Sequence, residues 1–343
     1  MNPRALAPVA ITCGAAALGI IGVLAGLWCA GYAPTSVVPT WLAAAAGNQL
    51  HLAASLQQAG PLLCAGLATA VAFRANALNI GVEGQYLLGA ITYVGIGVHV
   101  GHAPGLVMIP LLLLLAMASG AGWALIAFVL ERTRSVPIVL STILLNFIAV
   151  ALVSYLIEGP LHDPVTSAPQ TEQLASSLRL PVMISGTTLH VGVLLVAALA
   201  VVIWIAQNRT VLGYELTVVG ANERVARLSG IRVERVRGLA MAISGAIAGL
   251  GGALQQAGVT HYMSDGSVSY GYAGIAVALL GQLHPLGVAA AALYFGMLDS
   301  GSAGLERHLD IPHDVGDILK GVVTLVVLIA AVVSWRRRPR PGP

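Results

Sequence analysis

The chain has 343 residues, of which 57% are hydrophobic and only 9% are charged. Soluble domains carry about 25% charged residues, so these charges cannot cover a soluble globule of this length. The apolar residues fall into blocks of roughly 20, the length with which a helix crosses a hydrocarbon core of about 30 Å. Because the blocks lack the alternating polarity of an outer-membrane barrel, we expect transmembrane helices.

The first apolar block follows a single arginine and is too long for the hydrophobic part of a cleaved signal, so it predicts a retained first helix. Nine further blocks follow, of which 270–283 is short enough to be either a full span or a half-helix. We therefore predict an all-α, polytopic transmembrane helical bundle of about ten spans, forming a single domain over residues 1–343. The candidate spans are 9–31, 50–73, 78–100, 104–130, 136–157, 188–207, 238–257, 270–283, 285–303 and 315–335.

The distribution of basic residues predicts the orientation, because cytoplasmic loops of membrane proteins carry an excess of lysine and arginine. With the N-terminus inside and the sides alternating, 14 of the 17 basic residues fall inside. Arg179 and Arg307 fall outside, and Lys320 lies at the start of the last span. Both termini are thus expected in the cytoplasm. The longest outside loop is 158–187, which holds four prolines, and the longest inside loop is 208–237, which holds six arginines.

Polar residues gather near the start of the third span. Asn79, Glu83 and Gln85 lie there beside Gly81 and Gly84. A carboxylate near the hydrocarbon is costly unless it faces a cavity or finds donors. Closely spaced glycines let a helix break or a second helix approach. Two interpretations remain open: a discontinuous element that lines a solute path, or a structural Glu83 bonded to backbone at the cytoplasmic end of its helix.

A second feature lies in the long inside loop, where residues 220–231 read Gly-Ala-Asn-Glu-Arg-Val-Ala-Arg-Leu-Ser-Gly-Ile. Asn222 can cap a short helix, Glu223 then lies in its first turn, and Gly230 can end it in a left-handed turn. The helix is either a docking element for a cytoplasmic partner or a solvated loop helix. The residues expected to take part in docking are Gly220, Ala221, Asn222, Glu223, Arg227, Ser229, Gly230 and Ile231.

Further polar residues lie in or near later spans. Asn146 lies within the fifth span, where a lone polar residue more often joins two helices than contacts a ligand. Tyr272 follows a Ser- and Gly-rich stretch that suits either a broken helix opening to a cavity or an ordinary external loop. Asp317 and Lys320 are three residues apart and can pair on one helix face.

Several classes of protein are disfavoured by missing motifs. The sequence has no Gly-x-x-x-x-Gly-Lys-Ser/Thr run, so any ATPase that powers it must be another chain. The nine histidines show neither a His-Glu-x-x-His motif nor any paired spacing, and the three cysteines follow no metal or disulfide pattern. No basic face interleaved with aromatic residues indicates nucleic acid. A membrane-embedded enzyme is therefore a weak hypothesis.

Several separate motifs resemble those of a known family, in the same order along residues 60–330. They are Asn-Ile-Gly-Val-Glu-Gly-Gln at 79–85, Thr-Ile-Leu-Leu-Asn at 142–146, the 220–231 segment, Gly-Tyr-Ala-Gly-Ile-Ala-Val-Ala-Leu-Leu-Gly at 271–281 and Pro-Leu-Gly at 285–287. The chain resembles permease subunits of bacterial ABC importers for nucleosides and simple sugars, within the branched-chain amino acid and sugar permease superfamily.

This resemblance implies the partners. Two permease chains, expected to form a heterodimer, would form the pathway in the bacterial cytoplasmic membrane and contact its lipid. Two ABC ATPase subunits bind ATP and Mg, an external solute-binding protein delivers solute, and this chain holds no cofactor. The helix near 221–230 is expected to dock in a groove of the ATPase.

The resemblance also implies a solute class, which is nucleosides or purines, with a ribose-type sugar or riboflavin as alternatives. The low charge of the spans favours a neutral solute. The pathway residues to test are Asn79, Glu83, Gln85, Asn146 and Tyr272. A stand-alone secondary transporter is the runner-up, and it would need an intramembrane carboxylate, for which Glu83 is the candidate.

Overall fold

The computed structural model describes residues 28, 31–101, 103–264, 270–311, 318 and 321–322. Within these ranges the chain is helical and contains no strand, which confirms the predicted all-α class. Among the described residues, six helices are long and apolar enough to cross a membrane. They are α3 (Gln49–Arg74), α5 (Gly105–Arg134), α6 (Ile138–Glu158), α7 (Gly192–Arg209), α10 (Val233–Gln255) with its π-helical extension η2 (Gln256–Thr260), and α12 (Pro285–Leu309).

The remaining helices are shorter, and they differ from the predicted spans. The sequence analysis placed no helix between residues 31 and 50, yet α2 (Pro34–Ala46) forms there, with proline at its first position. The third predicted span, 78–100, contains α4 (Val82–Gly97), which has only 16 residues. The predicted first and last spans, and Asp317 and Lys320, lie almost entirely outside the described residues. The count of ten spans and the side of each terminus therefore stay predictions.

The short block at 270–283 forms α11 (Gly271–Leu280), a helix of ten residues. Ten residues rise about 15 Å, half the thickness of a hydrocarbon core, so this block is a half-helix. The chain then reverses through Gln282 and Leu283, both of which have positive φ, and enters α12.

The chain clusters into two compact units, Ala59–Leu293 and the combination of Met1–Gln58 with Tyr294–Pro343. In the second of these, α2 packs against the last turns of α12. The Ser300 hydroxyl donates to the Ala44 carbonyl over 3.2 Å, and a small apolar cluster forms around Val37, Leu305 and Ile311.

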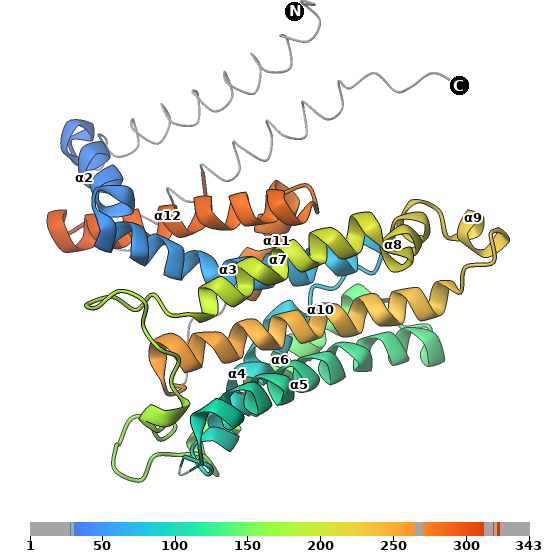
Figure 1. Cartoon of the computed structure of the whole chain (residues 1–343), viewed down its shortest axis with the longest axis horizontal. Helices are drawn as coiled ribbons and strands as arrows, with labels where there is room; N and C mark the ends of the chain where they lie inside the picture. Colours follow the sequence, from blue (N-terminus) through green and yellow to red (C-terminus); the bar gives the residue numbers. More distant parts are fainter. Residues whose placement is uncertain are drawn as a thin grey trace, which may run out of the picture. The chain divides into compact units, whose positions relative to one another are not determined.

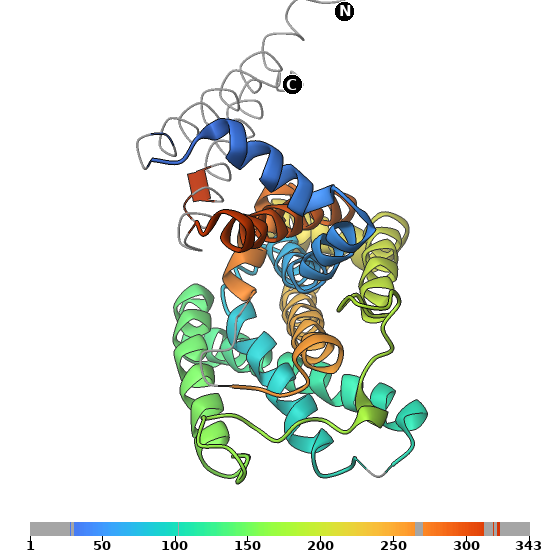
Figure 2. The ribbon, with the colours of Figure 1, turned by 90° about the vertical axis from the view of Figure 1, so that its left-hand side faces the viewer.

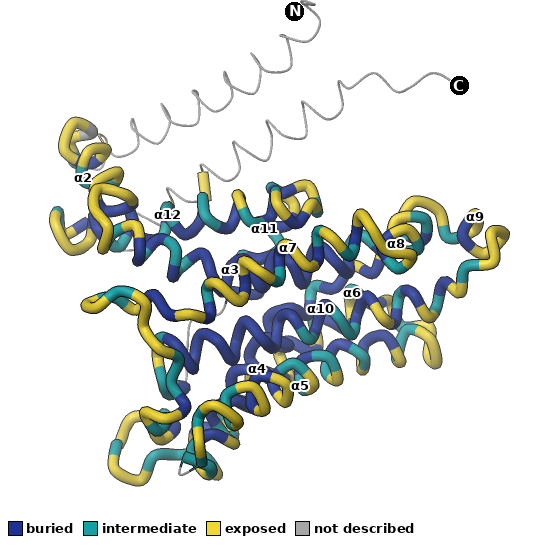
Figure 3. Tube along the Cα trace, viewed as in Figure 1, coloured by how far each residue is buried: buried dark blue, intermediate teal, exposed yellow. Residues whose placement is uncertain are grey.

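The centre of the larger unit is formed by α4, α5 and α10, which lie side by side (Figure 1). Glycines let these backbones approach, since a Cβ at Gly245 or Gly249 of α10 would overlap the backbone of α5. Gly89 of α4 meets Gly249 in the same way. Such small-residue contacts are how helices associate in lipid, where apolar burial gives no advantage over lipid tails. Accordingly, α4 and α10 are buried along most of their length, whereas α5 exposes one face (Figure 3).

One end of this unit is covered by the 158–187 loop, which crosses it in Figure 2. Apart from the 3₁₀ turn η1 (Ser176–Leu178), the loop has no helix. It is nevertheless held by backbone bonds, including Thr171 N–H to Met263 O and Leu180 N–H to Ala257 O, both 2.8 Å. The Tyr93 hydroxyl adds a bond to the Leu178 carbonyl.

The opposite end carries the 208–237 segment, which is more helical than predicted. It contains α8 (Val211–Ala221) and α9 (Glu223–Leu228), and α9 is the predicted capped helix. α8 packs on the end of α3, because a Cβ at Gly220 would overlap the Arg74 carbonyl. Arg74 also donates to the Gln207 side chain over 2.7 Å. The helix ends that bear the predicted cytoplasmic arginines thus lie together.

Candidate functional site

The five residues predicted for the solute path form two hydrogen-bonded sets at the start of α4, which together we call the polar junction. They are Asn79, Glu83, Gln85, Asn146 and Tyr272, and they join α4, α6 and α11. Asn79 lies in the turn before α4, and its side-chain amide pairs with that of Gln85 through bonds of 2.9 and 3.0 Å. Asn79 also donates to the Ser244 hydroxyl of α10 and accepts from the Gly81 N–H. Both amides are buried.

Asn146 connects the other parts of the junction. Its side-chain oxygen accepts from the Gly84 N–H at 2.9 Å, in the first turn of α4. Its amide nitrogen donates to the Ile80 carbonyl at 3.0 Å and contacts the Tyr272 hydroxyl at 3.2 Å. The first turn of a helix has N–H groups with no intrahelical partner, and Asn146 satisfies one of them from a different helix. The residue is therefore a helix-to-helix connection, as its position in the span indicated.

Glu83 lies where two helix N-termini meet. It belongs to the first turn of α4, and its carboxylate accepts from the backbone N–H of Tyr272, in the first turn of α11, over 3.3 Å. The starts of α4 and α11 are in contact here, because a Cβ at Gly271 would overlap the Glu83 backbone. Helix N-termini carry partial positive charge, so a carboxylate between two of them is stabilised. This geometry supports the structural interpretation of Glu83, with its partner on α11.

The members of the polar junction differ in accessibility. Asn79, Glu83, Gln85 and Asn146 are buried, whereas Tyr272 is 51% exposed. Of the five, Tyr272 is the residue whose side chain a solute could reach without disturbing the network. Two members were missed from the sequence: Ser244, and Thr142, whose hydroxyl accepts from the Ile80 N–H. A hydroxyl within an apolar or glycine-rich span was the available signal.

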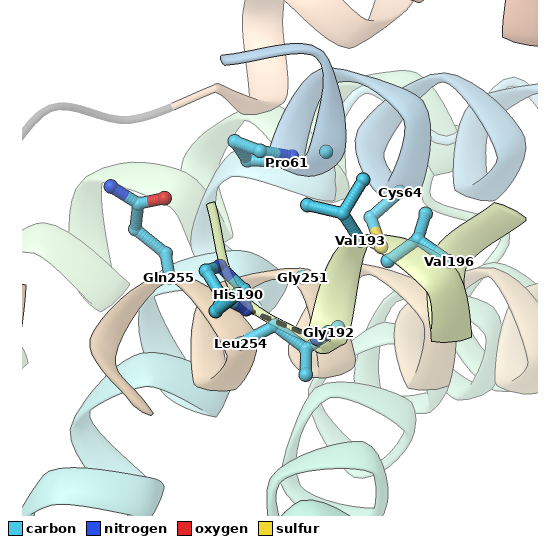
Figure 4. A pocket seen from close by; sticks show the side chains of 10 residues that line it. Pro61, Cys64, His190, Gly192, Val193, Val196, Gly251, Leu254 and Gln255 are labelled. Atoms are coloured by element: carbon cyan, nitrogen blue, oxygen red, sulfur yellow. Dashed lines mark hydrogen bonds between the residues drawn. The ribbon is translucent and has the colours of Figure 1, made fainter. Parts of the chain in front are cut away.

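A small cavity lies between α3, α7 and α10 (Figure 4). Its volume of about 10 Å³ holds no more than one water molecule, so it cannot bind a nucleoside or sugar. His190, just before α7, lines it and accepts from the Gly192 N–H. Burial, together with nearby His261, lowers the pKa of His190 to about 4, so its imidazole is neutral at pH 7. The ring packs against Gly192 and Gly258.

The second candidate site is the coupling segment, residues 220–231. Asn222 caps α9 as predicted, accepting from the N–H groups of Arg224 and Val225 at 3.0 and 3.3 Å. Gly230 follows the helix with φ of +79° and open space around it, as expected for the left-handed turn. Ala226 is the buried residue of α9, and its carbonyl accepts from the Ile231 N–H.

Ion pairs join the coupling segment to the spanning helices. Arg227 pairs with Glu223 and Glu234 at 3.8 and 3.2 Å, all on the partly exposed surface. Arg237 at the start of α10 pairs with Glu223 at 3.6 Å and with Glu131 of α5 at 2.9 Å. A displacement of α9 would therefore pull on α5 and α10 through Arg237. Gly220 serves helix packing, while Ala221 and Ser229 are exposed.

The sequence analysis missed two apolar residues of α9. Val225 is 50% exposed and Leu228 is 84% exposed, and the three-residue spacing puts them on one face. These two side chains give the six-residue helix α9 an exposed apolar face. The signal was present in the sequence as two apolar residues inside a polar segment.

Comparison with known proteins identifies the family. The family described as branched-chain amino acid transport system, permease component, matches residues 51–332. The guanosine ABC transporter permease protein of Bacillus subtilis is 33% identical over 324 residues, which cover 92% of each chain. The glucose ABC transporter permease protein of Haloferax volcanii is 30% identical, over 100% of this chain and 93% of the relative. The nucleoside ABC transporter permease protein of Lactococcus lactis is 30% identical, over 89% and 86%.

These matches confirm the resemblance that the separate motifs indicated. They run through both the polar junction and the coupling segment. The chain belongs to the branched-chain amino acid transport system permease family and is a multi-pass ABC transporter permease subunit.

Proposed function

We propose that this permease imports nucleosides or purines across a bacterial cytoplasmic membrane, driven by a separate ABC ATPase that binds ATP and Mg. The observation that carries the coupling is α9, a short capped helix with exposed Val225 and Leu228 that is tied by ion pairs to α5 and α10. These ion pairs connect α9 to the spanning helices, which favours a coupling role over that of a solvated loop helix. A second, different permease chain and an external solute-binding protein complete the proposed importer.

The proposed topology has ten spans, both termini in the cytoplasm and one permease domain over residues 1–343. Its support is the excess of arginine at the end of the molecule where α8 and α9 lie. Under this topology the 158–187 loop faces the external binding protein. Cysteine accessibility at Val165, which is 89% exposed, and at Leu228 tests it in intact cells. Labelling of residue 165 alone by a membrane-impermeant maleimide supports the orientation, and labelling of residue 228 alone contradicts it.

The solute class rests on two observations. Two of the relatives above are named for guanosine or nucleoside transport and one for glucose. The spans offer little charge for an anion, which favours a neutral solute. Uptake of labelled guanosine should therefore be competed by other nucleosides and less by ribose, glucose or riboflavin. If ribose or riboflavin competes more strongly than nucleosides, that compound is the better candidate for the transported solute.

For the mechanism, we propose that ATP binding moves α9, that Arg237 transmits the movement to α5 and α10, and that the pathway shifts between outward and inward access. Such a change is a shift between two packings, driven by differential nucleotide binding. The polar junction keeps the starts of α4 and α11 together during this change. Tyr272 is its proposed solute contact, since its ring is accessible while its hydroxyl is held by Asn146.

The decisive experiment is gentle purification of the tagged chain, followed by identification of whatever co-purifies. An ABC ATPase is expected in the complex, and uptake should require ATP. A stand-alone secondary transporter would instead purify without an ATPase, even after crosslinking, and its uptake would collapse with the proton or sodium gradient. Glu83, the carboxylate such a mechanism would use, already accepts a backbone bond from α11, which disfavours that alternative.

A further inference from the structure

A groove of about 670 Å³ lies beside the coupling segment, where α5 ends and α10 begins. Figure 1 shows these two helices running side by side toward α9. Four arginines and one glutamate line the groove, so it is strongly basic. Arg227 is paired with Glu234, but Arg132, Arg232 and Arg235 are exposed, and within the described chain no carboxylate lies within 4 Å of them.

The floor of the groove is apolar. Leu125 and Phe128 of α5 face Leu239 and Ala242 of α10 there. Leu125 is seven residues from Arg132, which places it about 10 Å further along the helix axis. The groove therefore changes from cationic to apolar over the distance that separates a lipid headgroup from the first part of its acyl chains.

We propose that this groove binds an anionic phospholipid, with the phosphate among Arg132, Arg232 and Arg235 and an acyl chain over the apolar floor. Charge complementarity identifies the headgroup, since basic pockets between transmembrane helices bind anionic lipid headgroups. The floor identifies the chains, because it lies within two membrane-spanning helices and adjoins the exposed apolar face of α5 at Ile126 and Val129. A cytosolic protein would have to enter the bilayer to reach Leu125.

The occupant would touch the coupling segment, because Arg227 and Ile231 also line the groove. Lipid binding would then favour the contact of α9 with α10 found in this structure. The proposal depends on membrane insertion alone, so it stands or falls separately from the identity of the solute or of the ATPase.

The test is native mass spectrometry of the purified full chain in detergent, titrated with dioleoyl phosphatidylglycerol or dioleoyl phosphatidylcholine. One phosphatidylglycerol per chain should be retained in preference to phosphatidylcholine. The triple variant R132Q/R232Q/R235Q should lose this retention by at least about tenfold, because each basic residue contributes about 1 kcal/mol near an anionic surface. The control R134Q/R209Q/R224Q removes the same charge from exposed arginines outside the groove and should bind like the wild type.

A second variant tests the apolar part without changing charge. Ala242→Trp fills the floor and should also weaken phosphatidylglycerol retention, while Gly122→Trp, at an open position of α5, should not. Equal loss in the arginine control, equal binding of phosphatidylcholine, or full retention in both groove variants would each overturn the proposal. So would unchanged lipid binding in R132Q/R232Q/R235Q together with loss of an associated protein, which would make the groove a protein interface.

Discussion

The polar junction and the coupling segment are both built around an asparagine that satisfies helix N-terminal N–H groups, but their surroundings differ. Asn146 is buried, and its side chain joins three helices that are distant in sequence. Asn222 is exposed, and its side chain accepts from N–H groups of its own helix. The same chemistry therefore holds the fold together in one place and preorganises a short surface element in the other.

This difference separates stability from coupling. A buried donor or acceptor that loses its partner cannot turn to water, so damage to the polar junction should appear as lost stability. When an exposed cap is removed, water can bond the freed N–H groups, so the stability of the whole fold changes little. Damage to the coupling segment should instead appear as a loss of communication with a partner.

The largest effect is expected for Asn146→Leu. The substitution leaves the Gly84 N–H and the Ile80 carbonyl without a partner and should lower the free energy of unfolding by about 2–4 kcal/mol. Denaturant titration in detergent measures it. Leu144→Ala, at an exposed position of the same helix, should cost less than about 1 kcal/mol. Equal losses in the two variants would remove the distinction between junction and surface.

Gly271→Ala comes next. A Cβ there would overlap the backbone of Glu83, so α11 must move away from α4, at an expected cost of about 1–3 kcal/mol. The matched control is Gly122→Ala, where nothing lies within 4 Å of the new Cβ and the higher helix propensity of alanine should leave stability unchanged or raised. A tolerated Gly271→Ala would mean that the two helix starts are not held in contact.

Asn222→Ala should have a smaller effect on the fold and a clearer one on transport. Loss of the cap costs about 1 kcal/mol within α9, without global unfolding. We expect ATP hydrolysis to continue while uptake per ATP falls several-fold. Gly230→Ala, which strains the left-handed turn, should behave alike. Asn208→Ala, at an exposed site near the end of α7, is the control, and unchanged uptake per ATP in Asn222→Ala would contradict the docking role.

The smallest effect is expected for Glu83→Gln. The amide oxygen can still accept from the Tyr272 N–H, while the charge between the two helix N-termini is lost, at a cost of about 0.3–1 kcal/mol. Uptake should persist. Complete loss of uptake with normal stability would show instead that the carboxylate takes part in transport.

The same contrast explains what the sequence could predict. Long apolar blocks located α3, α5, α6, α7 and α10 within a few residues, because hydropathy alone selects such segments. The cap at Asn222 and the turn at Gly230 were predictable because both are local.

Short or non-local features were harder to predict. α2 and α8 were missed, since helices of 13 and 11 residues lack a span-length signal. The five residues predicted for the solute path lie close together in the structure, and their role in transport stays a prediction, but their bonding was not predictable. It depends on bringing Asn146, Ser244 and Tyr272 together from distant parts of the chain.

The central claim is that α9 receives the movement of a partner ATPase, and crosslinking from its exposed residue Leu228 tests it most directly. Leu228→Cys, in a chain whose three native cysteines are replaced by alanine, would carry a benzophenone maleimide in the assembled transporter. The account predicts an adduct with the ATPase whose yield changes on adding ATP. Leu106→Cys, which is 89% exposed at the other end of α5, should give none. Labelled residue 228 that forms no ATPase adduct in an actively transporting complex would contradict the account.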